Sequence, residues 1–147
     1  VLDTGLKTET GGRLLRAKKL IKNNNFLLTY GDSLASFSLK KTFKEKNKSN
    51  FILSAFKYFV PYGVFGHTKQ QINKIYEKNY SVLINAGFYM FDKRVFNFIK
   101  SDEDSLENKI IPKIIKSKKI IIKYTLVNMW YPMDTIKDKK IIENKFK

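Results

Sequence analysis

The chain has 147 residues, of which 43% are hydrophobic and 14% aromatic; this suits one domain with a packed core and excludes a disordered tail or low-complexity linker. Lys and Arg number 29 against 13 Asp and Glu, and the formal net charge of +16 favours anionic partners: nucleic acid, phosphorylated small molecules or an acidic membrane surface. The absence of cysteine excludes disulfides, thiolate zinc sites and a cysteine nucleophile, and one histidine is too few for a histidine metal cluster.

Most of the positive charge comes from lysine. Only three of the 29 basic residues are arginines, whereas base readout and bidentate phosphate binding rely on arginine. No apolar run approaches the ~18 residues that a membrane span needs, and the first residues form no signal peptide. We therefore expect a cytoplasmic protein without a nucleic-acid or membrane partner.

The first half of the chain predicts alternating helices and strands. Apolar residues recur at helical spacing after a polar, turn-rich start, and short apolar runs between turn formers follow. The expected elements are a helix over 13–21 capped by Thr10, a buried strand over 26–30 that ends at Gly31-Asp32, a helix over 37–48 and a strand over 51–60.

The second half continues the alternation. The expected elements are a half-buried strand over 71–77, a longer strand over 81–91 with Gly87 inside it, helices near 92–100 and 106–117, a strand over 120–124 and a helix from about Asp134. Such alternation predicts an α/β sandwich with a mostly parallel sheet. Ligands of these sheets gather at the carboxyl ends of the strands, which directs attention to Asp32.

Two aspartates at junctions between elements are candidates for chemistry. Asp32 follows a buried strand beside the small Gly31, and Asp134 precedes the last expected helix. Each could instead have a purely structural role: Asp32 could be a turn residue bonded to its own backbone, and Asp134 could be a helix N-cap. If the strands that precede them are adjacent, the two carboxylates form an oxygen site suited to Mg²⁺ and a substrate phosphate.

Gly11 and Gly12 open the first expected helix. Glycines let a ligand approach the backbone, and free N–H groups at a helix start favour a negative group. The pair is also common in ordinary loops, so its signal alone is weak.

Six short segments occur together in a fixed order. They are Thr10–Leu14 (TGGRL), Phe26–Asp32 (FLLTYGD), Phe65–Gly66, Glu77–Lys78, Asn85–Tyr89 (NAGFY) and Trp130–Thr135 (WYPMDT). Together they resemble the sugar-1-phosphate nucleotidyltransferases, and most closely the members that use CTP and glucose 1-phosphate. The resemblance extends over essentially the whole chain, and TYGD with PMDT at this separation is its most specific part.

The resemblance implies a Rossmann-like, GT-A-like nucleotidyltransferase fold, with a mixed sheet flanked by helices. Residues 1–147 correspond to the later part of a single nucleotidyltransferase domain, incomplete at its N-terminus, because the family's Gly-rich triphosphate loop is not in this sequence. It implies that the chain as written is inactive and that the full-length protein forms a homo-oligomer.

The resemblance also assigns roles to individual residues. Asp32 and Asp134 match the family's two Mg²⁺ ligands, and Lys78 matches the lysine that meets the sugar phosphate; these three form the implied catalytic set. The implied substrate-binding residues are Thr10, Gly11, Gly12, Arg13, Tyr30, Gly31, Gly66, Glu77, Asn85, Gly87 and Trp130. The family's proline after Glu-Lys is replaced by Asn79, which puts sugar specificity in doubt more than reaction type.

The implied reaction is Mg²⁺-dependent transfer of a nucleotidyl group from a nucleoside triphosphate to a sugar 1-phosphate, as in the synthesis of nucleotide-sugar precursors of polysaccharides. The attacking phosphate is already a nucleophile, so the scarcity of histidine and cysteine is no obstacle. Two alternatives stay open: a basic nucleic-acid-binding module based on the lysines between 109 and 123, and a non-catalytic oligomerisation partner.

Overall fold

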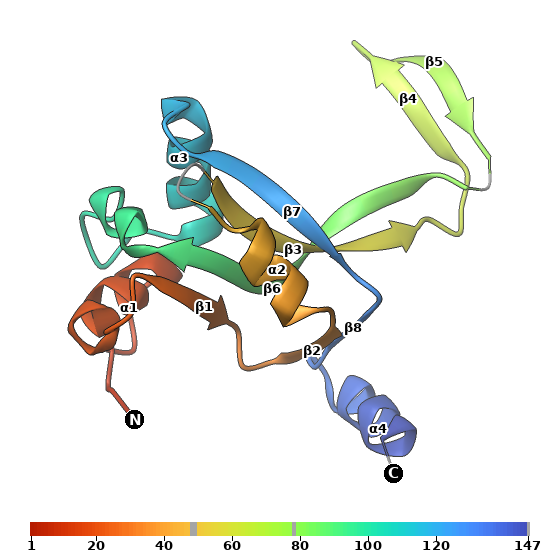
Figure 1. Ribbon diagram of the computed structural model, residues 1–147. Helices are drawn as coiled ribbons and strands as arrows, with labels where there is room; N and C mark the ends of the chain where they lie inside the picture. Colours follow the sequence, from red (N-terminus) through yellow and green to blue (C-terminus); the bar gives the residue numbers. More distant parts are fainter. Residues whose placement is uncertain (48–49, 78, 147) are drawn as a thin grey trace. The chain divides into compact units, whose positions relative to one another are not determined.

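The computed structural model describes residues 1–47, 50–77 and 79–146, and the chain divides into two compact units. Unit 1 comprises Val1–Tyr30, Ser38–Leu53 and Phe88–Thr125; unit 2 comprises Gly31–Phe37, Ser54–Gly87 and Leu126–Lys147. Figure 1 labels the elements along the chain.

Unit 1 holds a four-stranded sheet in the order β1-β6-β3-β7 together with most of the helical turns. Strands β3 and β6 continue into unit 2. The strands are β1 (Asn25–Thr29), β3 (Asn50–Phe59), β6 (Ser81–Asp92) and β7 (Ile121–Val127). The helical elements are α1 (Thr10–Ala17), the 3₁₀ turns η1 (Lys18–Leu20) and η2 (Lys93–Asn97), α2 (Leu39–Glu45), the π-helical turn η3 (Leu106–Ile110) and α3 (Ile111–Ser117).

The hydrophobic core lies in unit 1. Helix α1 contributes Leu14, the η3–α3 segment contributes Ile110 and Ile114, and the sheet contributes Phe51 and Phe91, all nearly or fully inaccessible to solvent. Phe51 and Phe91 meet edge to face with ring centroids 5.0 Å apart. Of the isoleucines in the helix expected over 106–117, Ile110 and Ile114 face the core, as their helical spacing indicates, whereas Ile115 is exposed.

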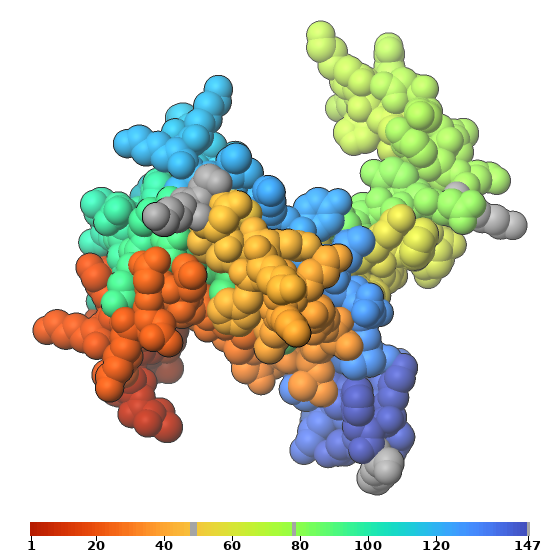
Figure 2. Space-filling model, viewed as in Figure 1, coloured from red at the N-terminus to blue at the C-terminus, as the bar shows by residue number. Residues whose placement is uncertain are grey.

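Unit 2 consists of two small antiparallel ladders and the last helix. The first ladder pairs β2 (Ser33–Ser36) with β8 (Met129–Pro132), and α4 (Ile136–Lys145) follows it. The second is a hairpin of β4 (Val64–Thr68) and β5 (Gln71–Tyr76), in which Phe65, Ile72 and Ile75 are each more than half exposed. The yellow-green atoms in Figure 2 show this hairpin.

The α/β class with a mixed sheet and flanking helices is confirmed. The expectation of a mostly parallel sheet is wrong for the ladders with a described register, since β1–β6, β2–β8 and β4–β5 all run antiparallel. The short strands β2, β4 and β8 were not expected, and the helix expected near 92–100 is only a 3₁₀ turn. Among the described residues, each helix is too short or too polar to cross a bilayer.

The start of α1 also differs from the prediction. Helix α1 begins at Thr10, with Glu9 in the extended N-cap position, so Thr10 is inside the helix rather than its cap. Gly11 and Gly12 have no side chains, so this first helical turn packs directly on the backbone of residues 102–104. The helix therefore begins earlier in the chain than expected.

Candidate active site

The β2–β8 ladder brings Asp32 and Asp134 to the same end of unit 2. Ser33 pairs with Pro132 at the first position of the ladder, and one step further the Met133 N–H donates to the Asp32 carbonyl oxygen at 2.7 Å. Each aspartate therefore lies just beyond a paired strand position. The sequence prediction that the strands preceding the two aspartates are adjacent is wrong: β1 pairs with β6, and it is β2, which follows Asp32, that pairs with the tryptophan strand β8.

Neither aspartate side chain is used for local structure. Both are exposed, and neither has a hydrogen bond or ion pair with a described residue. The alternative that Asp134 caps the last helix is wrong, because Thr135 is the N-cap of α4 and forms a reciprocal capping box with Asp138. A Cβ added to Gly31 would meet no described atom within 4 Å, so the backbone beside Asp32 is open, as the sequence predicted.

The donor set at this end of the ladder fits magnesium with help from a substrate. Within the described ranges, no group of three or more His, Cys, Asp or Glu side chains could hold a metal without further ligands. Mg²⁺ is bound in many proteins by one or two carboxylates together with substrate phosphates. Asp32 and Asp134 are two such carboxylates, without a competing partner in the described part of the chain.

In unit 1, the glycine pair is used for packing. A Cβ on Gly11 would lie 2.4 Å from the Asp104 carbonyl oxygen, and one on Gly12 would lie 2.6 Å from the Asp102 backbone. The N–H groups of both glycines donate to the Asp104 carbonyl oxygen, at 2.8 and 3.2 Å. These N–H groups thus have a protein acceptor, and the sequence interpretation that they are free for a ligand does not hold in this structure.

The loop that receives the glycines is fixed by a buried carboxylate. The Asp104 side chain pairs with Lys109 and accepts the Lys100 N–H at 2.7 Å. The Lys109 hydrogen bond and then the Lys100 N–H lower the pKa of Asp104 to about 2. The carboxylate is therefore ionised at neutral pH and holds the loop against α1.

Glu107 joins several candidate residues of unit 1. Its carboxylate accepts hydrogen bonds from the hydroxyls of Thr10 at 3.2 Å, Tyr89 at 2.9 Å and Tyr30. The Thr10 oxygen in turn accepts the Leu106 N–H at 2.8 Å. One carboxylate thereby fixes the first residue of α1 relative to the residue that precedes Gly31-Asp32.

Thr10, Arg13 and Tyr30 share a cavity of about 420 Å³ in unit 1. Its other walls are mostly apolar side chains of α1 and β1, and the guanidinium of Arg13 donates to the Thr4 hydroxyl at 2.8 Å and the Leu6 carbonyl at 3.3 Å. The volume is in the range of small-molecule sites. Three of the predicted substrate-binding residues are thus brought together.

The remaining predicted residues lie in unit 2. Gly66 sits in β4 opposite Lys74, where an added Cβ would lie 3.2 Å from the lysine Cβ. Glu77 is exposed just after β5. In β6, the Asn85 side chain accepts the Gly87 N–H at 3.1 Å, and Gly87 has a φ of +79°, a conformation that favours glycine. Lys78 lies outside the described residues.

Trp130 lies in β8, four residues before Asp134. Its ring packs against Phe56 with centroids 5.9 Å apart. Its indole N–H is buried and has no hydrogen-bond partner among the described residues. A buried donor without an acceptor is costly, so this N–H is available to a group that the described residues do not supply.

Comparisons with known proteins agree with the resemblance found in the sequence. The chain is 30% identical to the glucose-1-phosphate cytidylyltransferase of Salmonella typhimurium and 29% identical to that of Salmonella typhi, in each case over 97% of this chain and 57% of that protein. No family model matches. The resemblance to sugar-1-phosphate nucleotidyltransferases is therefore confirmed.

Solved structures identify the fold. HddC from Yersinia pseudotuberculosis superposes with a TM-score of 0.70 at 24% identity, over 95% of this chain and 63% of that one. The inositol-1-phosphate CTP transferase of T. maritima superposes with a TM-score of 0.65 at 17% identity, over 93% of this chain and 61% of that one. This is a nucleotidyltransferase fold. The chain spans little more than half the length of the curated relatives that it matches.

Within this nucleotidyltransferase fold, Glu107 is the residue that sequence reasoning missed. It follows the acidic run Asp102–Asp104 at the start of a segment rich in lysine and isoleucine, and no local pattern distinguishes it from those neighbours. Spacing alone could not reveal that its side chain points toward Thr10 and the two tyrosines, because these partners come from distant parts of the chain.

Proposed function

We propose that this protein transfers a nucleotidyl group from a nucleoside triphosphate, CTP, to a sugar 1-phosphate, glucose 1-phosphate, and releases pyrophosphate. The printed names of its Salmonella relatives supply the two substrates. The observation that carries the proposal is the β2–β8 ladder, which leaves the carboxylates of Asp32 and Asp134 open at one end.

The chemistry requires positioning and charge neutralisation rather than a protein nucleophile. An oxygen of the sugar phosphate attacks the α-phosphorus, the bond from that phosphorus to the oxygen bridging it to the β-phosphate breaks, and pyrophosphate leaves with the bonding electrons. Asp32 and Asp134 would hold Mg²⁺, which neutralises phosphate charge when bound.

The substrate contacts follow from the resemblance. Lys78 is proposed to meet the attacking phosphate, and Glu77 and Asn85 the sugar hydroxyls, with Gly66 and Gly87 admitting the sugar to the backbone. For the nucleotide, the cavity of Thr10, Arg13 and Tyr30 offers apolar walls to a base. The indole N–H of Trp130 is a donor for a substrate oxygen near the ladder.

A Gly-rich phosphate loop between a strand and a helix does not occur in residues 1–147. Backbone N–H groups of such a loop cradle a triphosphate, and orientation supplies up to roughly 7–11 kcal/mol of the barrier reduction. We therefore propose that residues 1–147 alone do not transfer nucleotides above background.

The test is pyrophosphate release from CTP and glucose 1-phosphate with Mg²⁺ by the full product of the native gene, with residues 1–147 alone as a second sample. We expect turnover by the first sample and background from the second. Asp32→Asn and Asp134→Asn should each reduce kcat by about 100-fold or more, because each removes one of the two carboxylates proposed to hold Mg²⁺.

Glu143→Gln is the matched control, since it removes an exposed carboxylate of α4 whose contact with Lys139 is 3.7 Å long. No release by the native protein would refute the proposal, as would equal activity of the three variants. Two alternatives have their own signatures: a nucleic-acid module would bind DNA or RNA with an affinity that falls steeply with salt, and a non-catalytic partner would assemble without turnover.

A further inference from the structure

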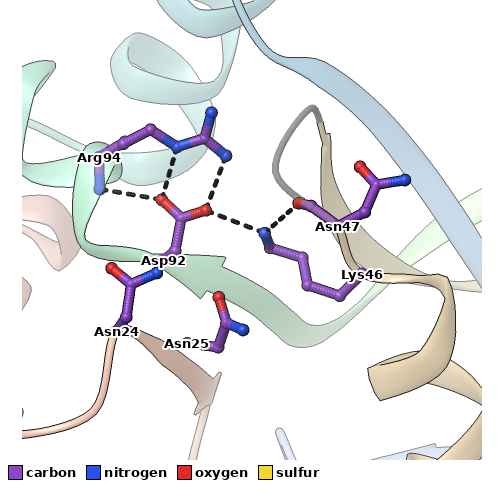
Figure 3. Close-up of a pocket in the computed structure, with 6 residues that line it drawn as sticks. All are labelled: Asn24, Asn25, Lys46, Asn47, Asp92 and Arg94. Carbon is purple, nitrogen blue, oxygen red and sulfur yellow. Dashed lines mark hydrogen bonds and ion pairs between the residues drawn. The ribbon is translucent and has the colours of Figure 1, made fainter.

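A second cavity in unit 1 lies where β1 begins and β6 ends, at the opposite end of β1 from Tyr30 (Figure 3). Its volume is about 550 Å³. The described residues that line it all have polar side chains and come from three parts of the chain: Asn24, Asn25, Lys46, Asn47, Asp92 and Arg94. None of these residues lines the cavity of Thr10, Arg13 and Tyr30.

A buried ion cluster forms the floor of this cavity. The side chains of Lys46 and Asp92 are only 2% and 4% exposed, and the lysine ammonium lies 2.9 Å from the carboxylate. Arg94 adds two hydrogen bonds to the same carboxylate, at 2.8 and 2.7 Å. Burial raises the pKa of Asp92, but hydrogen bonds from Arg94 and Lys46 outweigh it and lower the pKa to about 2.

The charges in the cavity do not balance. Two cations, Lys46 and Arg94, share one carboxylate, and the described residues of the lining include no other acidic side chain. The backbone N–H of Lys93 donates to the Asn24 carbonyl at 3.1 Å, whereas its exposed ammonium donates to the Lys22 carbonyl at 2.9 Å. Buried charges in excess are costly unless a counter-ion balances them, so this cavity favours an anion.

Hydrogen-bond donors also remain unused. The Lys46 ammonium has three hydrogens and two acceptors, Asp92 and the Asn47 carbonyl at 2.7 Å. Within the described part of the chain, Nη1 of Arg94 and the side-chain amides of Asn24 and Asn25 have no hydrogen-bond partner. Figure 3 shows both amides beside the Asp92–Lys46 pair.

We propose that this cavity binds a phosphate-type oxyanion, either inorganic phosphate or the phosphate group of a small monoester. Guanidinium, ammonium and amide N–H groups are the donors that phosphate oxygens accept, and charge-assisted bonds of this kind are the stronger ones. The volume accommodates a small organic phosphate. An ion pair that served only to fasten the segment after α2 to β6 would account for Asp92 but not for the cavity beside it or for the amides of Asn24 and Asn25, which are unpaired within the described chain.

The test is calorimetric titration of the full chain with inorganic phosphate and, separately, with glycerol 3-phosphate, at constant ionic strength set with chloride. We expect saturable binding in at least one titration, and the tighter of the two identifies the source of the phosphate group. The double variant Asn24→Ala/Asn25→Ala should weaken that binding at least about tenfold without changing Tm, because both side chains are exposed and make no bond to a described residue.

Lys116→Gln is the matched control, since it removes one exposed positive charge from α3 in the same unit and should leave the affinity unchanged. Arg94→Lys keeps the charge but removes Nη1, and should also weaken binding. Absence of saturable binding of both probes would overturn the proposal, and so would equal binding by the double asparagine variant.

Discussion

The two regions that hold the candidate site use their polar groups differently. In unit 1, Gly11, Asp104 and Glu107 are each bonded to other parts of the protein, and their geometry is fixed by those bonds. In unit 2, Asp32 and Asp134 have no partner among the described residues, although a ladder places them together. Bonded polar groups contribute to folding, whereas unbonded ones at the same end of a ladder remain available to a ligand.

The largest effect should come from the packing of α1. Gly11→Ala places a Cβ 2.4 Å from the Asp104 carbonyl oxygen, which is backbone and cannot easily move. We expect a loss of about 3 kcal/mol in the free energy of unfolding, measured by urea denaturation. Gly31→Ala is the control, because its Cβ meets no described atom within 4 Å. An equal loss of unfolding free energy in both variants would contradict the claim that Gly11 is needed for packing and Gly31 is not.

The next effect concerns Glu107. Glu107→Gln replaces an acceptor of hydroxyl hydrogens from Thr10, Tyr30 and Tyr89 with a weaker one that also carries donors, and should cost about 1–3 kcal/mol in unfolding free energy. Asp32→Asn should change stability by less than about 0.5 kcal/mol while removing activity. Denaturation curves for both variants check this pair, and a large destabilisation by Asp32→Asn would show that the open carboxylate has a structural role.

Acid should act on unit 1 through its paired carboxylates. The pKa values of Asp92 and Asp104 are both about 2 in the folded protein, below the ordinary 3.8. Their stabilising contribution is therefore complete above about pH 4 and is lost as the pH falls toward 2. Thermal unfolding across this window should show a falling Tm, and Asp104→Asn should make the fall less steep; an unchanged slope would mean that this pairing does not govern acid stability.

The smallest effect should come from the last helix. Thr135→Ala removes the N-cap of α4 and should cost about 1 kcal/mol, whereas Asp134→Ala should leave stability nearly unchanged. The comparison is made by thermal unfolding of the two neighbouring variants. A larger loss for Asp134→Ala would restore the interpretation of Asp134 as a structural residue.

Sequence periodicity predicted the elements whose apolar residues recur at helical or strand spacing. Ile110 and Ile114 are examples, because burial against the core imposes their helical spacing. The four-residue strands β2 and β8 are too short for a pattern, and they exist because each pairs with the other across the chain. Their pairing decides where Asp32 and Asp134 lie, which is why residue types suggested a metal site but could not place it.

The glycine pair Gly11-Gly12 shows where prediction from local sequence fails. From sequence alone, Gly11-Gly12 at a helix start is equally compatible with a bound anion and with close packing. The structure supplies a backbone acceptor for both N–H groups, and it comes from residues almost a hundred positions later. Contacts of this kind depend on tertiary structure, so local sequence rules do not reach them.

Trp130 provides an intrinsic fluorescence signal from a defined position in the protein. It is the single tryptophan of the chain, so the indole emission comes from one position in β8. Because its ring is packed against Phe56 and its N–H lacks a described acceptor, a change in polarity or hydrogen bonding at the ladder alters the emission of this fluorophore directly. Binding at the proposed aspartate pair should therefore change this emission, which can be measured without a label.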